Sequence, residues 1–290
     1  MSATRWHLFL VMLLALGLTA PALGAAPGKF YLVSTGPGDP KYLTLQAIEA
    51  MQQADLILSH PQAAKKVAKY IAGKKVEDPW PQLWWHEGKV WMKDLHTYKP
   101  EERPRIVALK AKERDEYVQK IKRLLAQGKN IVLLDEGDPT IYPRGFWLLE
   151  GLSDDQIEIV PGVGAMTASL AALKRSSSGA GVRYVLQSAP YAFFGKQDHD
   201  DLAKALAQFP GTYVFYMGLA QLPELVATLK KYHPATLPVA LVYYAGYADQ
   251  EKVVKGTLAD ILSKADPQEK WLGMIMVGPA LTGPHFVLTE

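Results

Sequence analysis

Three short turns rich in glycine carry the residue types best suited to hold a small molecule. They are Gly36-Pro37-Gly38-Asp39, Gly137-Asp138-Pro139 and Pro161-Gly162-Val163-Gly164. Each follows an apolar run, and the first and third open into a helical pattern. Glycine lets the backbone come close to a ligand, and a helix N-terminus offers unpaired N–H groups. The three turns therefore predict a binding site for a small molecule.

The spacing in the first turn excludes the fingerprint of a nicotinamide dinucleotide site. That fingerprint, G-x-G-x-x-G, would place its third glycine at position 41, which is Lys41. The acidic residue expected after the second strand is also missing from the sequence, because that strand ends at Ser59-His60. The first turn must therefore serve another ligand.

Short apolar runs alternate with amphipathic helical patterns in the first part of the chain. Strands are predicted at 30–35, 56–58, 75–76, 130–134 and 157–160, and helices at 43–53, 62–71, 114–126 and 165–173. Residues 77–104 contain several prolines and are predicted to be irregular. Apolar strands separated by helices indicate a parallel sheet with both faces covered. The glycine turns then share the edge where the strands end.

A second α/β set follows residues 174–181, a stretch of small and polar residues that is typical of a linker. Its strands are predicted at 183–187, 212–216, 239–243 and 273–277, and its helices at 201–208 and 222–231. We therefore predict two α/β domains, which comprise residues 27–177 and 178–290.

Composition excludes several classes of function. The 290 residues carry a formal net charge of +3, which gives no electrostatic footprint for nucleic acid. Cysteine is absent, so the chain has no disulfide, thiolate nucleophile or thiolate zinc site.

The N-terminal residues 1–26 have the pattern of a secretory signal peptide. Arg5 makes the start positive, 8–18 is an unbroken apolar run, and small residues at 22–26 suit cleavage. The run is shorter than the ~20 apolar residues of a spanning helix. We expect an exported protein, periplasmic if the source is bacterial. An uncleaved membrane anchor is the alternative.

Further short motifs accompany the three turns in a fixed order. They are Leu43-Thr44, Gln53-Ala54-Asp55, Tyr142 with Gly145, Tyr216-Met217-Gly218, Pro238-Val239-Ala240 with Gln250, and Gly256-Thr257-Leu258. With these motifs the chain resembles the tetrapyrrole (corrin/porphyrin) methylase family over nearly all of residues 29–280. Members of that family are S-adenosylmethionine-dependent methyltransferases of the cobalamin and sirohaem pathways.

The resemblance implies a homodimer and S-adenosyl-L-methionine as cofactor. It also implies a mostly parallel N-terminal sheet, a mixed C-terminal sheet and an active site in the cleft between the two domains. The implied cofactor contacts are Pro37, Glu136, Gly137, Asp138, Ile141, Gly164, Ala165, Met217 and Ala245. A sulfonium cation with an apolar adenine suits backbone oxygens, small residues and a soft neighbour such as methionine.

Three positions depart from the family pattern, and one of them is Pro143, where relatives usually have Gly. The third turn lacks the Thr or Ser hydroxyl that relatives commonly place beside a small residue. His60 stands where some porphyrinogen methylases have an aspartate that is proposed as a base. A histidine can accept the proton that a C-methylated pyrrole must lose. The alternative is a partly exposed histidine without a catalytic role.

Residues 77–104 are rich in aromatic side chains, and in the family this region leads toward the substrate. Trp84, Trp85 and His86 are therefore candidate substrate contacts, because a flat macrocycle stacks on such rings. The alternative is an aromatic loop that packs on the body of the protein or on a partner subunit. We expect no metal site.

These features predict a methyltransferase that acts on a tetrapyrrole-like, corrin or porphyrin precursor. The alternative is an exported tetrapyrrole- or haem-binding protein that reuses the cleft without catalysis. That alternative arises because S-adenosylmethionine is made in the cytoplasm and is charged, so export separates the protein from its cofactor. The expected partner is a small molecule and not nucleic acid.

Overall fold

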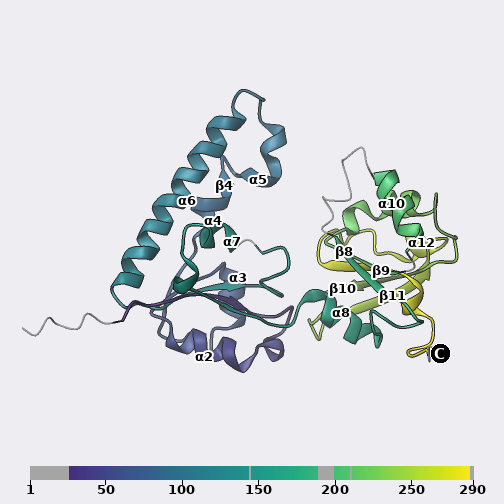
Figure 1. The fold of residues 1–290 in the computed structure, drawn as a ribbon, viewed down its shortest axis with the longest axis horizontal. Helices are drawn as coiled ribbons and strands as arrows, with labels where there is room; N and C mark the ends of the chain where they lie inside the picture. Colours follow the sequence, from purple (N-terminus) through teal and green to yellow (C-terminus); the bar gives the residue numbers. More distant parts are fainter. Residues whose placement is uncertain (1–25, 144, 189–198, 210, 288–290) are drawn as a thin grey trace, which may run out of the picture.

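The computed structural model describes residues 26–143, 145–188, 199–209 and 211–287. It contains two α/β domains and an arm that rises from the first domain on one long helix (Figure 1). Apart from Ala26, the segment predicted as a signal peptide lies outside the described residues. Within the described ranges, no helix is both long and apolar enough to cross a membrane.

The first domain is built on a five-stranded sheet in which every pairing is parallel, as predicted. In spatial order the strands are β3 (Lys75–Glu77), β2 (Leu56–Leu58), β6 (Ile131–Asp135), β1 (Phe30–Ser34) and β7 (Ile157–Val160). Side chains alternate along a strand. Leu32 and Leu133 therefore face one side of the sheet, and Val33 and Val132 face the other.

Helices cover both faces of this sheet. The face that carries Val33 packs against α2 (Leu45–Gln53) and the segment that begins with α3 (Pro61–Lys66). The opposite face packs against α4 (Trp80–Trp84), α6 (Arg103–Ala126) and α7 (Phe146–Leu149). Apolar strands with both faces covered are the arrangement that the sequence pattern predicted.

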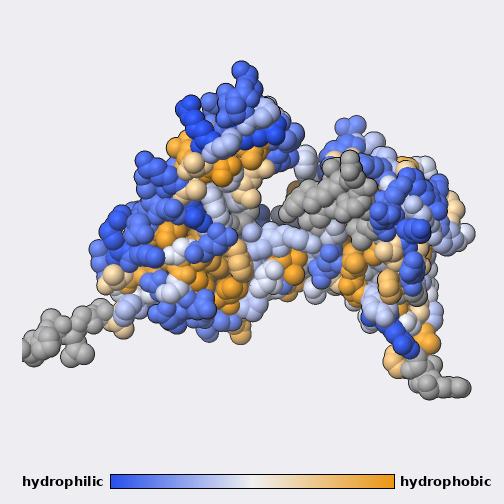
Figure 2. Space-filling view, turned by 45° about the horizontal axis from the view of Figure 1, so that its top comes forward, coloured by the Kyte–Doolittle hydropathy of each residue, from blue (hydrophilic) through white to orange (hydrophobic). Residues whose placement is uncertain are grey.

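The arm corrects the prediction that residues 77–104 are irregular. In place of an irregular segment, the chain forms α4, a hairpin of β4 (Trp85–His86) and β5 (Lys89–Val90), and α5 (Trp91–Asp94). The helix predicted from residue 114 begins at Arg103. Pro104 lies in its first turn, where the N–H that proline lacks has no partner in any case. Figure 2 shows polar residues at the tip of the arm and apolar residues below it.

Lys110 explains why the first half of α6 could not be predicted from the sequence. It lies on a buried face of the helix, where its charge interrupts the apolar pattern. Its ammonium group donates to the carbonyl oxygens of Gln82 (2.8 Å) and Trp85 (2.6 Å) and to Glu113 (2.7 Å). These bonds satisfy the charge and tie the hairpin to the helix.

The second domain is built on a five-stranded mixed sheet, as predicted. Its order is β11 (Lys252–Thr257), β10 (Pro238–Tyr243), β12 (Gly273–Val277), β9 (Gly211–Tyr216) and β8 (Tyr184–Ser188). β8 and β9 pair in parallel, and the other pairings are antiparallel. β11 was not predicted, because this strand has no buried apolar run.

Helices also cover both faces of the second sheet. One face packs against α10 (His199–Ala207), α11 (Leu222–Leu229) and α12 (Ile261–Lys264), and the other packs against α8 (Ala165–Leu173). α8 thus covers the second sheet, although it precedes the domain boundary predicted between residues 177 and 178. That boundary stays a prediction. β7 ends at Val160 in the first sheet, and α8, which packs on the second sheet, begins at Ala165. The chain therefore crosses from one domain to the other within residues 161–164.

The two domains touch where two backbone turns cross. The Asp39 N–H donates to the Gly246 oxygen (2.9 Å), and the Ala248 N–H donates to the Asp39 carboxylate (2.9 Å). A Cβ on Gly38 would lie 2.2 Å from the Gly246 carbonyl carbon, and a Cβ on Gly246 would lie 2.7 Å from the Pro37 oxygen. Both glycines also have positive φ angles, 62° and 88°. The crossing therefore requires glycine at both positions.

We expect Gly246→Ala to lower the free energy of unfolding by about 2 kcal/mol, because it adds both backbone strain and a clash with Pro37. Gly73→Ala is the matched control. Gly73 has a similar φ of 76°, but a Cβ there meets nothing within 4 Å. Gly73→Ala should therefore lower the free energy of unfolding by only about 1 kcal/mol, the cost of the backbone strain alone. Urea unfolding followed by circular dichroism measures both. Equal losses would contradict a close crossing.

Candidate functional site

The three glycine turns of the first domain meet at Ser34, the last residue of β1. The Ser34 hydroxyl donates to the Gly137 oxygen (2.6 Å) and accepts from the Gly36 N–H (3.0 Å). The Gly36 oxygen in turn accepts from the Gly137 N–H (3.1 Å). A Cβ on Gly162 would lie 1.9 Å from the Ser34 hydroxyl oxygen, so the third turn can approach only as glycine. Ser34 thus joins turns that lie far apart in the sequence.

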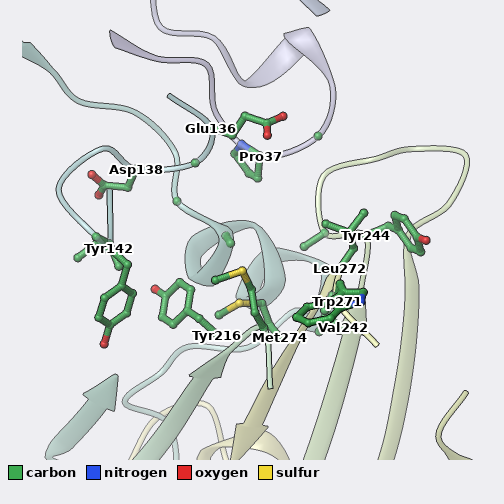
Figure 3. Close-up of a pocket in the computed structure, with 18 of the residues that line it drawn as sticks. Pro37, Glu136, Asp138, Tyr142, Tyr216, Val242, Tyr244, Trp271, Leu272 and Met274 are labelled. Carbon is green, nitrogen blue, oxygen red and sulfur yellow. The ribbon is translucent and has the colours of Figure 1, made fainter. Parts of the chain in front are cut away.

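These turns form one wall of a cavity of about 450 Å³, a size typical of small-molecule sites (Figure 3). The other wall comes from the second domain, at the ends of β9 and β10 and the start of β12. All nine residues that the resemblance implies as cofactor contacts line the cavity: Pro37, Glu136, Gly137, Asp138, Ile141, Gly164, Ala165, Met217 and Ala245. Tyr142 and Tyr216, which belong to the motifs of the family resemblance, also line the cavity. Other lining residues have no motif that marks them in the sequence: Tyr244, Tyr247, Trp271, Leu272 and Met274.

Strained backbone is concentrated in this lining. Tyr142, Met217 and Tyr244 have φ angles of 55°, 51° and 49°, in the left-handed region that favours glycine. Such strain is typical of binding sites, where the surrounding contacts must hold it. The rings of Tyr142 and Tyr216 pack edge to face at 5.4 Å and join the turn after β6 to the end of β9. Figure 3 shows both rings on the side of the cavity opposite Trp271.

Glu269 holds the wall of the second domain in place. Its carboxylate accepts hydrogen bonds from the Tyr244 hydroxyl and from the N–H groups of Trp271 (2.7 Å) and Leu272 (2.9 Å). These bonds, above all that from Tyr244, lower the pKa of the Glu269 carboxyl. The Tyr244 N–H also donates to the Leu272 oxygen (2.9 Å). The wall is therefore a connected network, although no sequence motif marks Glu269.

The cavity wall is negatively charged. Asp135, Glu136 and Asp138 line it, and the described lining residues include no Lys, Arg or His. The rest of the surface is largely apolar, with two methionines, Met217 and Met274, and several aromatic rings. Such a wall favours an organic cation with an apolar portion.

Lys66 compensates part of this charge from behind the first turn. Its ammonium group donates to the Gly36 oxygen (2.7 Å). Burial lowers the pKa of Lys66 to about 8, although the carboxylates of Glu136 and Asp39 act in the opposite direction. Lys66 therefore connects α3 to the turn that crosses the second domain. Lys66 was not among the predicted site residues, because nothing near it in the sequence resembles a motif.

His60, the residue considered as a base, does not line the cavity. It is half-buried and directly precedes α3, and its main-chain oxygen accepts from the Ser59 hydroxyl (2.9 Å). A catalytic role for His60 stays a prediction. The described residues contain no cluster of acidic residues and histidines that could hold a metal ion.

The aromatic candidates also lie away from the cavity. Trp84 packs with the rings of Trp80 (5.9 Å) and Trp147 (6.0 Å) beside the core of the first domain. Trp85 is 48% exposed on the hairpin of the arm. His86 borders a separate hollow of about 90 Å³ together with Tyr98 and Arg105. The structure therefore does not bring Trp84, Trp85 and His86 to the cavity, and their contact with a substrate stays a prediction.

Fold and site together define a class: a two-domain α/β protein that holds a small molecule between a parallel and a mixed sheet. Within this class, the chain belongs to the tetrapyrrole (corrin/porphyrin) methylase family, whose model matches residues 29–262.

Individual relatives agree with this assignment. The chain is 32% identical to a uroporphyrinogen-III C-methyltransferase of Priestia megaterium, over 87% of this chain and 97% of the relative. It is 30% identical to the protein of the same name from Methanocaldococcus jannaschii, over 87% and 96%.

Solved structures show the same fold. A cobalt precorrin-4 methyltransferase gives a TM-score of 0.64 at 22% identity and covers 87% of this chain and 95% of its own. Uroporphyrin-III C-methyl transferase from Thermus thermophilus, complexed with S-adenosyl homocysteine, gives 0.58 at 22% identity, over 88% and 99%.

We expect the Lys66 amine to titrate near pH 8. Between that pH and the ordinary lysine value of about 10.4, the unfolded chain keeps a proton that the folded chain has released. This group therefore makes the folded state more stable as the pH rises. Urea unfolding at about pH 7 and about pH 9.5 measures this effect. Between these pH values, the free energy of unfolding of the wild type should rise relative to that of Lys66→Met. Parallel pH profiles of the two proteins would contradict the assignment.

Proposed function

We propose that this protein is an S-adenosyl-L-methionine-dependent methyltransferase that acts on a tetrapyrrole-like acceptor. The observation that carries the proposal is the cavity in which the nine implied cofactor contacts converge beside three carboxylates. A negatively charged wall attracts a sulfonium cation. Membership of the family, and similarity to enzymes named uroporphyrinogen-III C-methyltransferase, support the class of acceptor.

The residues of the cavity fit this cofactor. Gly164 and Ala165 provide a surface of small residues, and Met217 offers a polarizable sulfur. Gly137 leaves open space, because a Cβ there would meet nothing within 4 Å. When bound, S-adenosylmethionine supplies an electrophilic methyl group.

The contribution of the chain to methyl transfer is alignment and the exclusion of water. Ser34 sets the position of the glycine turns, and Glu269 sets that of the facing wall. Met217 and Trp271 are about half-exposed at the rim, so an acceptor reaches the cavity from their side. A misplacement of about 1 Å in such a site costs on the order of 100-fold in rate, which is why the walls are tied by hydrogen bonds.

We expect Gly137→Arg to abolish cofactor binding and to leave the fold intact. The open space at Gly137 accepts the new side chain without a clash, but its cation enters the wall that should hold the sulfonium. Calorimetric titration of the purified protein with S-adenosylmethionine measures the affinity. Gly73→Arg is the matched control, because Gly73 has a similar φ and open surroundings outside the cavity.

Two outcomes of this titration would count against the proposal. Unchanged affinity in Gly137→Arg would place the cofactor elsewhere. Absence of binding by the wild type at millimolar cofactor would remove the enzymatic function, and a tetrapyrrole-binding protein without catalysis would then be the better explanation.

We also propose that the protein is exported by residues 1–26 and that it forms a homodimer. Export is supported by the apolar run behind Arg5 and by the small residues at 22–26. The homodimer is supported by the family resemblance alone.

A reporter enzyme that is active only outside the cytoplasm tests export when it is fused after residue 30. We expect full reporter activity, and we expect its loss when Leu13 and Leu14 are both changed to Arg, because charge interrupts the apolar run. Activity of a cytoplasmic reporter in the same fusion would contradict export and would leave the protein beside its cofactor.

A further inference from the structure

The tip of the arm touches the second domain at the rim of the cavity. The ammonium group of Lys93, in α5, lies 4.2 Å from the centre of the Trp271 ring. Trp271 lies just before β12 and lines the cavity. Two segments far apart in the sequence therefore meet beside the opening through which an acceptor must pass.

Trp271 offers a large flat surface at this rim. Its side chain is 55% exposed, and the adjacent Leu272 is 51% exposed. An aromatic side chain that lines a cavity and is also exposed can stack against a flat ligand. The backbone of both residues is held by Glu269, so the point from which the indole projects is fixed. Figure 3 shows Trp271 on the second-domain side of the cavity, beside Val242 and Met274.

Lys93 carries a charge that is available to a ligand. In the part of the chain that the structure describes, it forms no ion pair with a carboxylate. A cation over an exposed indole gains little energy, and the long lysine stem lets the ammonium move.

The charges on the two sides of the rim have opposite signs. The cavity wall holds Glu136 and Asp138, whereas the arm places the Lys93 ammonium over Trp271. Carboxylate groups of an acceptor are therefore repelled by the cavity and attracted to the tip of the arm. An acidic macrocycle at the rim is thereby oriented with an acidic arm toward α5.

We propose that Trp271 and Lys93 bind the methyl acceptor. A flat macrocycle lies against the Trp271 indole, and one of its carboxylate arms pairs with the Lys93 ammonium, which leaves the indole as the acceptor enters. This inference rests on the proposed function, because it assumes that the cavity below holds the methyl donor. It assigns the acceptor to two residues that no sequence motif marks.

Titration of the full chain with uroporphyrin, a flat tetrapyrrole with many carboxylate arms, tests the indole contact. Binding is followed by the absorbance of the porphyrin itself. We expect Trp271→Ala to weaken binding about tenfold, as the loss of aromatic stacking predicts, and Trp271→Phe to weaken it less. Tyr184→Ala is the matched control, because Tyr184 is 54% exposed, nearly the same as Trp271, but does not line the cavity.

Charge reversal tests the contact with Lys93. We expect Lys93→Glu to weaken uroporphyrin binding about threefold or more, and to affect coproporphyrin, which has fewer carboxylate arms, less. Lys89→Glu makes the same change of charge on the same arm, where the lysine lies over Tyr98 and not over Trp271. It should therefore have the smaller effect.

The outcomes separate this inference from the proposed function. Calorimetry with S-adenosyl homocysteine measures binding to the cavity independently of the acceptor. Absence of that binding in the wild type would contradict the proposed function. A wild type that binds S-adenosyl homocysteine but not uroporphyrin would overturn the acceptor site alone. So would Trp271 and Lys93 variants that bind uroporphyrin no more weakly than their matched controls, provided that circular dichroism shows them folded.

Discussion

The passage of one backbone turn across another, at Gly38 and Gly246, is the constraint on which the rest of the molecule depends. Because neither position leaves space for a Cβ, the distance between the domains is set by main-chain contact. Each domain has its own hydrophobic core on both faces of its sheet. The cavity therefore belongs to neither domain alone and takes its width from the crossing.

Polar side chains preserve the shape that the crossing establishes. Ser34 ties the glycine turns on one side, and Glu269 ties Tyr244, Trp271 and Leu272 on the other. Hydrogen bonds to a charged carboxylate are stronger than neutral ones, and they help to offset the strained backbone of Tyr244. The acidic residues of the cavity favour a cationic methyl donor, and the lysine of the arm favours an acidic acceptor.

Much of the fold could be predicted because it depends on local patterns. The buried runs around Leu32 and Leu133 have the composition of parallel strands, and the glycine turns follow from their position after strands. The arm could not be predicted, because Lys110 is a buried charge whose partners, Gln82 and Trp85, belong to another segment. Its charge interrupts the apolar pattern by which a helix is recognised, and the sequence offers no sign that three acceptors will satisfy it.

The sequence by itself determined the alternating strands and helices, the three turns and the set of implied cofactor contacts that converge on one cavity. The alternation and the turns depend on residue type and short-range spacing, whereas the set of contacts is what the family resemblance implies. Only the tertiary structure decided that Trp84 packs beside a core while Trp271 faces the cavity, and that Ser34, Lys66 and Glu269 support its walls. The physical reason is that burial and hydrogen-bond partners are properties of contacts between distant segments, and a tryptophan or a lysine has the same local signature in either setting.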